Sequence, residues 1–265
     1  MLRSLYTAAT GMEAQETKME IVANNLANAS TTGFKKVQAN FEDLLSETVH
    51  TPAGPESGLN VSEPAGIQVG LGTRLQSTTP NLTEGDMTNT NNTFDIAIQG
   101  NGYFKVQQAD GTFAYTRAGN FSVSAQGQLV TQNGLQVEPG ISIPTQTTQV
   151  TISPQGQVMA TVAGRTDPTQ VGQIELATFT NPGGLIAQGN NLLVETPASG
   201  TPITVKPGEQ GTGQLAQGYL EGSNVQAVNE MIDMIAAQRA YEMNSQVITA
   251  ANDMLQRLTN MQLSS

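Results

Sequence analysis

Cysteine is absent from this 265-residue chain, and long apolar runs are absent as well. Without cysteine the chain has no disulfide, no thiolate metal site and no cysteine nucleophile. No segment approaches the roughly 18 consecutive apolar residues of a membrane-spanning helix, so we expect no membrane insertion. Charged residues interrupt the first twenty positions, which is untypical of a cleavable signal peptide. If the protein leaves the cytoplasm, we expect export without one.

Charge is scarce too. Asp, Glu, Lys and Arg make up 12% of the residues, roughly half the usual fraction. The net charge is −11 at pH 7, and no run of Lys or Arg occurs. A nucleic-acid backbone or an anionic membrane surface attracts basic clusters, so we expect neither as a partner. A neutral surface instead suits wide contacts between copies of the chain, because few charges need to be desolvated.

Both ends of the chain predict long amphipathic helices. The N-terminal apolar stripe stops before Gly33, a residue typical of a helix C-terminus. The C-terminal stripe follows Ser223-Asn224-Val225-Gln226, which has the form of a capping box. Its mean spacing of about 3.6 residues predicts a nearly straight helix. Two narrow stripes make a thin core alone, so we expect packing both between the helices and between copies. The predicted packing residues are Leu5, Met12, Met19, Val22, Leu26, Val225, Val228, Ile232, Ile235, Met243, Val247, Met254 and Leu258.

Three asparagines stand inside the N-terminal helical pattern, at Asn24, Asn25 and Asn28. Asparagine is a poor residue for a helix interior, because its amide competes for backbone hydrogen bonds. Their spacing predicts that the amides share one flank of the helix. An uncharged amide both donates and accepts, so we predict a polar interface between copies. The alternative is that the three residues only weaken the helix near its end.

The centre of the chain changes to an alternating pattern typical of strands. Asn101-Gly102 and Asp110-Gly111 each separate two alternating runs, as in β-hairpins. A Pro/Gly-rich stretch, Thr51 to Gly66, reads as an extended arm. We therefore predict an α+β fold whose long terminal helices pack as an antiparallel coiled-coil-like pair. Its parts would be a terminal helical domain (1–33 and 222–265), extended connecting arms (34–92 and 187–221) and a central all-β domain of many short strands (93–186).

Catalytic and cofactor motifs are not evident. The lone histidine, His50, precedes the Pro/Gly-rich stretch with no catalytic cluster around it. "VGLG" at 69–72 lacks the third glycine of a dinucleotide loop, since Leu75 stands there. No carboxylate pair is marked for acid–base work. We therefore expect no enzymatic activity and no cofactor or metal.

Several of these segments resemble the bacterial flagellar rod and hook family. The resemblance lies in "IVANNLANAS" (21–30), "FDIAIQGNGYF" (94–104), "YTRAGNFSVSAQGQLVTQNGLQV" (115–137) and "GYLEGSNVQAVNEMIDMIAAQRAYEMNSQVITAANDML" (218–255). It covers nearly the whole chain, with the motifs in order. Residues 30–49 and the arm that follows are most similar to the distal-rod members.

The resemblance implies a structural subunit of a helical tube, with the terminal helices innermost. The tube would be the drive shaft through the periplasm and part of the export channel. Implied partners are further copies of the chain, other rod proteins and the hook protein, the P- and L-ring proteins, and the flagellar type III export apparatus. Phe41 and Leu45 have the spacing of the export-recognition element of early flagellar substrates, or they form an ordinary apolar anchor.

Alternatives remain open at this point. The chain could be a hook or proximal-rod member of the same family. It could also be a secreted, adhesin-like β module on a helical stalk. A polysaccharide-cleaving enzyme is a third class, but the sequence offers it no acidic pair.

Overall fold

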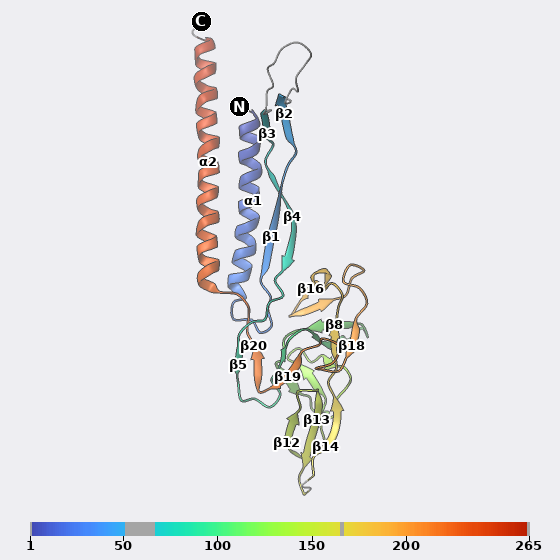
Figure 1. Cartoon of the computed structure of the whole chain (residues 1–265). Helices are drawn as coiled ribbons and strands as arrows, with labels where there is room; N and C mark the ends of the chain where they lie inside the picture. Colours follow the sequence, from blue (N-terminus) through green and yellow to red (C-terminus); the bar gives the residue numbers. More distant parts are fainter. Residues whose placement is uncertain (1, 51–66, 165–166, 264–265) are drawn as a thin grey trace, which may run out of the picture. The chain divides into compact units, whose positions relative to one another are not determined.

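The computed structural model describes residues 2–50, 67–164 and 167–263 (Figure 1). The fold is α+β, with a helix at each end and strands between them. The chain divides into two units. The terminal unit comprises Met1–Leu26, Val37–Thr79 and Gln226–Ser265, and the strand unit comprises 27–36 and 80–225.

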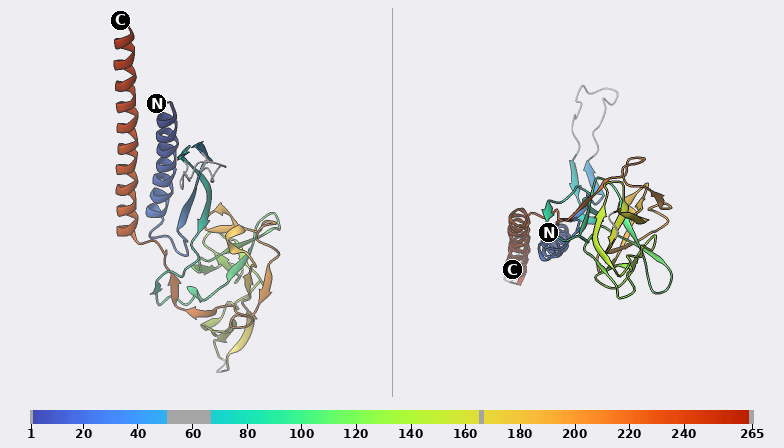
Figure 2. Two further views of the ribbon diagram at one scale, coloured as in Figure 1. Left: turned by 45° about the horizontal axis from the view of Figure 1, so that its top comes forward. Right: turned by 90° about the horizontal axis from the view of Figure 1, so that it is seen from below.

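Two helices form most of the terminal unit, α1 (Leu2–Ala27) and α2 (Ala227–Leu263). The 37 residues of α2 make it about 55 Å long at 1.5 Å per residue. The helices lie side by side in Figures 1 and 2, and their contacts run in opposite senses. Asn25 bonds to Glu230, whereas a Cβ added at Gly11 would lie 2.8 Å from the Asn244 amide nitrogen. A glycine at position 11 therefore permits the close approach.

The helix ends differ from the predicted caps. Ser223 Oγ accepts from the Val225 N–H, and the first helical acceptor is the Gln226 carbonyl, bonded by the Glu230 N–H at 3.1 Å. The predicted capping box is therefore wrong. Gly33 does adopt a left-handed conformation (φ +69°), but α1 has already ended at Ala27.

An antiparallel ribbon completes the terminal unit. β1 (Val37–Asp43) pairs with β4 (Thr73–Pro80), and β2 (Ser46–His50) pairs with β3 (Ile67–Gly70). The Leu44 N–H donates to the Gly72 carbonyl and joins the two ladders. Gly72 (φ +116°) lies against Thr10 of α1, where a Cβ would clash. The arm predicted at Thr51 to Gly66 lies outside the described residues.

The strand unit consists of short antiparallel strands. Its strands are β5 (Met87–Asn89), β6 (Ile96–Gln99), β7 (Tyr103–Gln107), β8 (Phe113–Thr116), β9 (Phe121–Val123), β10 (Leu129–Thr131), β11 (Gln136–Val137), β12 (Thr147–Ile152), β13 (Gln157–Val162), β14 (Thr169–Gln173), β15 (Leu176–Thr178), β16 (Ile186–Gly189), β17 (Leu192–Val194), β18 (Ile203–Val205), β19 (Gln214–Gln217) and β20 (Tyr219–Glu221), with a 3-10 turn at Pro182–Gly184. Among the described residues, the largest sheet runs β16-β17-β8-β7-β11-β10-β9, and β15 joins β7 to β18. Three further strands form β12-β13-β14, and β6 and β5 pair with β19 and β20.

The two predicted hairpins have different outcomes. Asp110-Gly111 does turn the chain between β7 and β8, with Gly111 at φ +83°. Asn101-Gly102 does not form a hairpin, because β6 pairs with β19 and not with β7. The Gly213 N–H and the Arg117 guanidinium occupy the carbonyls of Asn101 and Gly102. These acceptors are therefore unavailable for the predicted ladder.

The core of the strand unit lies between its sheets. Phe104 and Phe121 are buried and pack edge to face, with ring centroids 4.9 Å apart. Aliphatic side chains from many short strands surround them, including Ile96, Ile98 and Leu176. β6 is buried on both faces, so its alternation of large and small residues reflects packing and not one exposed face.

Candidate functional site

Asn25 is the polar centre of the terminal unit. Its exposed fraction is only 2%. Its amide oxygen accepts from the Val37 N–H at 3.0 Å, and its amide nitrogen donates to the Val37 carbonyl at 2.9 Å and to Glu230 at 3.2 Å. One side chain thus connects α1, the start of β1 and the first turns of α2.

The three asparagines have different environments, and Asn28 lies beyond the end of α1 at Ala27. Asn24 is exposed, and half-buried Asn28 accepts a hydrogen bond from the Thr31 hydroxyl at 3.1 Å. Asn25, by contrast, is buried inside the terminal unit. Its role in the structure is intramolecular, because the N–H and the carbonyl of Val37 both bind its side-chain amide.

α2 turns one line of side chains toward α1 and exposes its large apolar ones. The line toward α1 recurs every seven residues and consists of small or polar side chains: Glu230, Ala237, Asn244 and Ala251. At about 100° per residue, Val228, Ile232 and Ile235 lie opposite this line, whereas Val247 and Met254 lie beside it. The exposed set, which we call the apolar stripe of α2, consists of Val228, Met231, Ile232, Ile235, Met243, Val247, Met254 and Met261.

The predicted packing residues therefore fall into different environments. On α1, Val22 is buried and Leu5, Met12, Met19 and Leu26 are half-buried. On α2, Val228, Ile232, Ile235, Met243, Val247 and Met254 are exposed members of the stripe. Val225 is buried, but it lies in the strand unit before α2 begins. The side chain of Leu258 lies outside the described part of the structure.

The ribbon beside α1 carries a second set of exposed apolar residues. Phe41 in β1 is 37% exposed, and Leu45 between β1 and β2 is 87% exposed. Ile67, Val69 and Leu75 are exposed as well. Ion pairs at 42–74 and 3–47 lie near them, each between partly exposed side chains.

A buried ionic cluster lies in the strand unit. Glu221, with an exposed fraction of 1%, accepts from Arg117 Nε at 2.6 Å and from Lys35 Nζ at 2.5 Å. The Gly85 N–H also donates to this carboxylate, at 3.2 Å. Arg117 in turn donates to the carbonyls of Ile98, Gly100 and Gly102. Every charged group of the cluster therefore has several partners.

The cluster shifts the pKa of its members. Burial alone would raise the pKa of Glu221, but the charges and hydrogen bonds of Arg117 and Lys35 lower it below its ordinary value. Burial lowers the pKa of Lys35, although the Glu221 carboxylate opposes that shift. The carboxylate is therefore held ionised, because two buried cations surround it.

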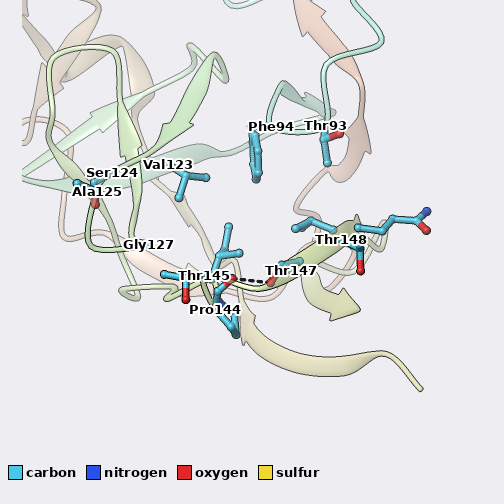
Figure 3. Close-up of a pocket in the computed structure, with 13 residues that line it drawn as sticks. Thr93, Phe94, Val123, Ser124, Ala125, Gly127, Pro144, Thr145, Thr147 and Thr148 are labelled. Atoms are coloured by element: carbon cyan, nitrogen blue, oxygen red, sulfur yellow. Dashed lines mark hydrogen bonds between the residues drawn. The ribbon is translucent and has the colours of Figure 1, made fainter. Parts of the chain in front are cut away.

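The surface of the strand unit has an open groove of about 460 Å³ between the β9–β10 turn and the start of β12 (Figure 3). Phe94 and Val123 stand opposite Pro144, Thr145 and Thr147. None of its lining residues carries a carboxyl, amino, imidazole or thiol group. The lining offers Ser and Thr hydroxyls as nucleophiles, but it contains no His, Lys, Asp or Glu side chain that would activate them.

The described residues contain no cluster of three or more His, Cys, Asp or Glu side chains that could hold a metal ion. The described helices lack an apolar stretch of the length that a membrane crossing needs.

Three segments of the chain match known protein families. Residues 5–35 match the family described as "Flagella basal body rod protein". Residues 97–160 match "Flagellar hook protein FlgE/F/G D1 domain", and residues 216–261 match "Flagellar basal body rod FlgEFG protein C-terminal". Together they take in most of both helices and the strands β7 to β11 of the largest sheet.

Whole-chain relatives decide the family. The chain is 48% identical to the flagellar basal-body rod protein FlgG of Caulobacter vibrioides, over 96% of this chain and 97% of the relative. It is 45% identical to FlgG of Buchnera aphidicola from Acyrthosiphon pisum, over 98% and 100%. The rod protein FlgF of Caulobacter vibrioides is 36% identical, over 91% and 90%. The chain belongs to the flagellar basal-body rod protein family. It is a structural subunit of the distal rod in the flagellar basal body, as the resemblance implies.

Sequence reasoning missed the ionic cluster of this rod-family chain. Arg117 and Glu221 both lie inside the motifs quoted for the resemblance, "YTRAGNF" and "GYLEGSN". A lone charge inside a glycine-rich or apolar strand is unusual in a chain with so few charges. That feature is a usable signal for a buried pair, although it does not reveal which charges meet.

Proposed function

We propose that this rod subunit polymerises into a helical tube in which the apolar stripe of α2 packs against neighbouring copies. The stripe is the observation that supports the proposal. Its large side chains are exposed in the single chain, whereas the line through Glu230 and Asn244 already contacts α1. Exposed apolar surfaces of this extent mark interaction sites.

The size of the stripe is sufficient for assembly. Full burial of a Val, Ile or Met side chain contributes about 1.5–3 kcal/mol. Association of two bodies costs an estimated 4–15 kcal/mol. The eight side chains of the stripe are 47–69% exposed, so their burial against neighbours contributes roughly 7–14 kcal/mol, which is of the same size as that cost.

Within one chain, we propose that α1 and α2 act as an antiparallel coiled-coil-like pair. Their mutual face is small and polar, with Gly11, Ala237, Asn244 and Ala251. Such a face allows close approach but buries little apolar area, so the pair depends on neighbouring copies for its stability. This dependence suits a subunit that orders its helices on assembly.

The wider arrangement follows from the resemblance. We place residues 1–33 and 222–265 in the inner tube, 34–92 and 187–221 in a connecting region, and 93–186 outside as a β domain. The tube would serve as the drive shaft in the periplasm and as part of the export channel. The partners would be other rod proteins and the hook protein at its ends, the P- and L-ring proteins around it and the type III export apparatus.

The test is a strain that lacks this subunit, complemented with wild-type protein or with a variant of the α2 stripe. We expect the deletion strain to be non-motile, and its basal bodies to lack the distal rod in electron micrographs. Wild-type protein should restore both. Normal motility and intact basal bodies in the deletion strain would instead indicate an independent secreted module.

A further inference from the structure

Three segments of the strand unit border the terminal unit in sequence. They are residues 27–36, 80–86 and 221–225, and each ends at a boundary between the two units. Inside the strand unit the three are bonded to one another. The Asn81 N–H donates to the Lys36 carbonyl, the Gly222 N–H donates to the Asp86 carbonyl and the Gly33 N–H donates to the Glu221 carbonyl. We refer to them as the border segments.

We propose that Lys35, Arg117 and Glu221 form an ionic latch that makes the three border segments open and close as one cooperative unit. Lys35 belongs to the first segment and Glu221 to the third. The second segment donates its Gly85 N–H to Glu221 and accepts from Lys35 through the Thr83 carbonyl, at 2.7 Å. Arg117 comes from the interior of the unit and anchors the carboxylate.

The physical basis is the cost of an unpaired buried charge. If the first segment opened alone, Glu221 would lose its lysine. If the third opened alone, Arg117 and Lys35 would both lose their carboxylate. Removing one partner of a buried ion pair is strongly destabilising, because the other charge stays out of water without compensation. Partial opening is therefore opposed more strongly than joint opening, in which Lys35 and Glu221 reach water together and Arg117 keeps its bonds to the carbonyls of residues 98, 100 and 102.

Asn224 extends the latch with neutral bonds. Its amide nitrogen donates to the carbonyls of Asn81 and Thr83, at 2.9 and 3.1 Å, and its amide oxygen accepts from the Lys36 N–H at 2.7 Å. These bonds hold the same three segments in register. These bonds are neutral, so they align the three segments. The penalty for partial opening comes from the buried charges of the ionic groups.

The latch lies within the folded single chain and does not depend on the proposed tube. The test is hydrogen exchange of the purified full-length protein, read at the amides of Gly33, Lys36, Gly85 and Gly222. In the wild type we expect one opening constant, with the same dependence on urea, at all four. In Glu221→Gln we expect exchange at least about tenfold faster at all four, a change of about 1.4 kcal/mol or more. Glu209→Gln, an exposed site in the same unit, is the matched control and should leave the rates unchanged.

A second variant covers the case in which Glu221→Gln fails to fold. Lys35→Met/Glu221→Gln removes the lysine charge and the carboxylate charge that face each other. The new glutamine still offers an amide oxygen as an acceptor for Arg117, and the three carbonyl contacts of Arg117 remain. We expect this variant to fold, with exchange rates that differ between the border segments. The latch is refuted if the four amides retain a common opening constant in the double variant. It is also refuted if Glu221→Gln accelerates exchange at Gly222 alone.

Discussion

The side chain of Asn25 binds both backbone polar groups of Val37, as a neighbouring strand would. The Val37 N–H donates to the amide oxygen at 3.0 Å, and the amide nitrogen donates to the Val37 carbonyl at 2.9 Å. A helix residue thus closes the open edge at the first residue of β1. The carboxamide offers a donor and an acceptor side by side, whereas an ionised Asp offers only acceptors and Ala offers neither.

Asn25→Ala should destabilise the terminal unit by about 1–3 kcal/mol, the usual cost of leaving buried polar groups without their partner. The substitution removes the Asn25 bonds of Val37 and of Glu230 together. Urea unfolding followed by helical circular dichroism measures the change. Glu16→Ala, on the same helix and exposed, should stay within about 0.5 kcal/mol of wild type. Equal effects of the two substitutions would contradict the intramolecular role of Asn25.

Ile235→Asp should prevent rod assembly while leaving the folded subunit intact. Ile235 is 57% exposed in the single chain, so the new carboxylate remains solvated there. In the proposed interface it would be buried without a partner, at a cost of several kcal/mol. Motility of the complemented deletion strain, and rods in its basal bodies, are the measurements. Asn252→Asp adds the same charge away from the stripe and should assemble normally. A motile Ile235→Asp strain would remove the stripe from the interface.

The helix at each end of the chain and the strands between them were predictable, because they depend on local periodicity. The start of α2 near Val225 and the turn at Asp110-Gly111 follow from such patterns. The sequence could not predict which partner the α2 stripe faces, because an apolar stripe has the same period whether it faces α1 or another copy. Gly11 and Asn244 settle that question in the structure, and neither is apolar.

Long-range polar contacts were out of reach of the sequence for a similar reason. Asn24, Asn25 and Asn28 look alike in the helical pattern, and only the position of Val37 selects Asn25. Glu221 meets Lys35 and Arg117 from 186 and 104 residues away. The failed hairpin at Asn101-Gly102 has the same origin, since Arg117 occupies a carbonyl that the hairpin model assigned to a neighbouring strand.

Phe41→Ala should accumulate inside the cell although the protein is stable, if Phe41 and Leu45 form an export-recognition element. The structure offers a matched control in the same ribbon. Phe41 is 37% exposed and Leu75 is 38% exposed, so truncating either removes a similar amount of exposed apolar surface. The measurement is the ratio of secreted to cellular protein. Leu75→Ala should be secreted normally. If both variants are secreted like wild type, Phe41 is an ordinary surface residue.

Acid should weaken the strand unit through Glu221. Its pKa is lower in the folded protein than in the unfolded chain, so its contribution to stability is complete above the ordinary glutamate pKa of about 4.3. That contribution is lost as the pH falls through the lower folded value. Glu221→Gln should cost roughly 3–5 kcal/mol at pH 7, and the difference from wild type should shrink below about pH 4.3. Urea midpoints at pH 7, 4 and 3 measure it. A difference that does not change with pH would contradict an ionised carboxylate.

The Pro/Gly-rich arm gives the last prediction, which concerns shaft stiffness. Residues 51–66 lie outside the described residues, but the strands on either side define where they begin and end. His50 and Ile67 are register partners that close the β2–β3 ladder, so a two-residue Asn-Gly turn can join them without disturbing it. We expect a subunit with this replacement to be exported and to polymerise, but into a more flexible tube, because the arm would no longer lie against a neighbouring copy. A Gly/Ser segment of equal length keeps the reach of the arm without its prolines, and should give a flexible tube as well. Curvature of rods in electron micrographs is the measurement, and straight rods of normal length from the Asn-Gly variant would show that the arm is a passive linker.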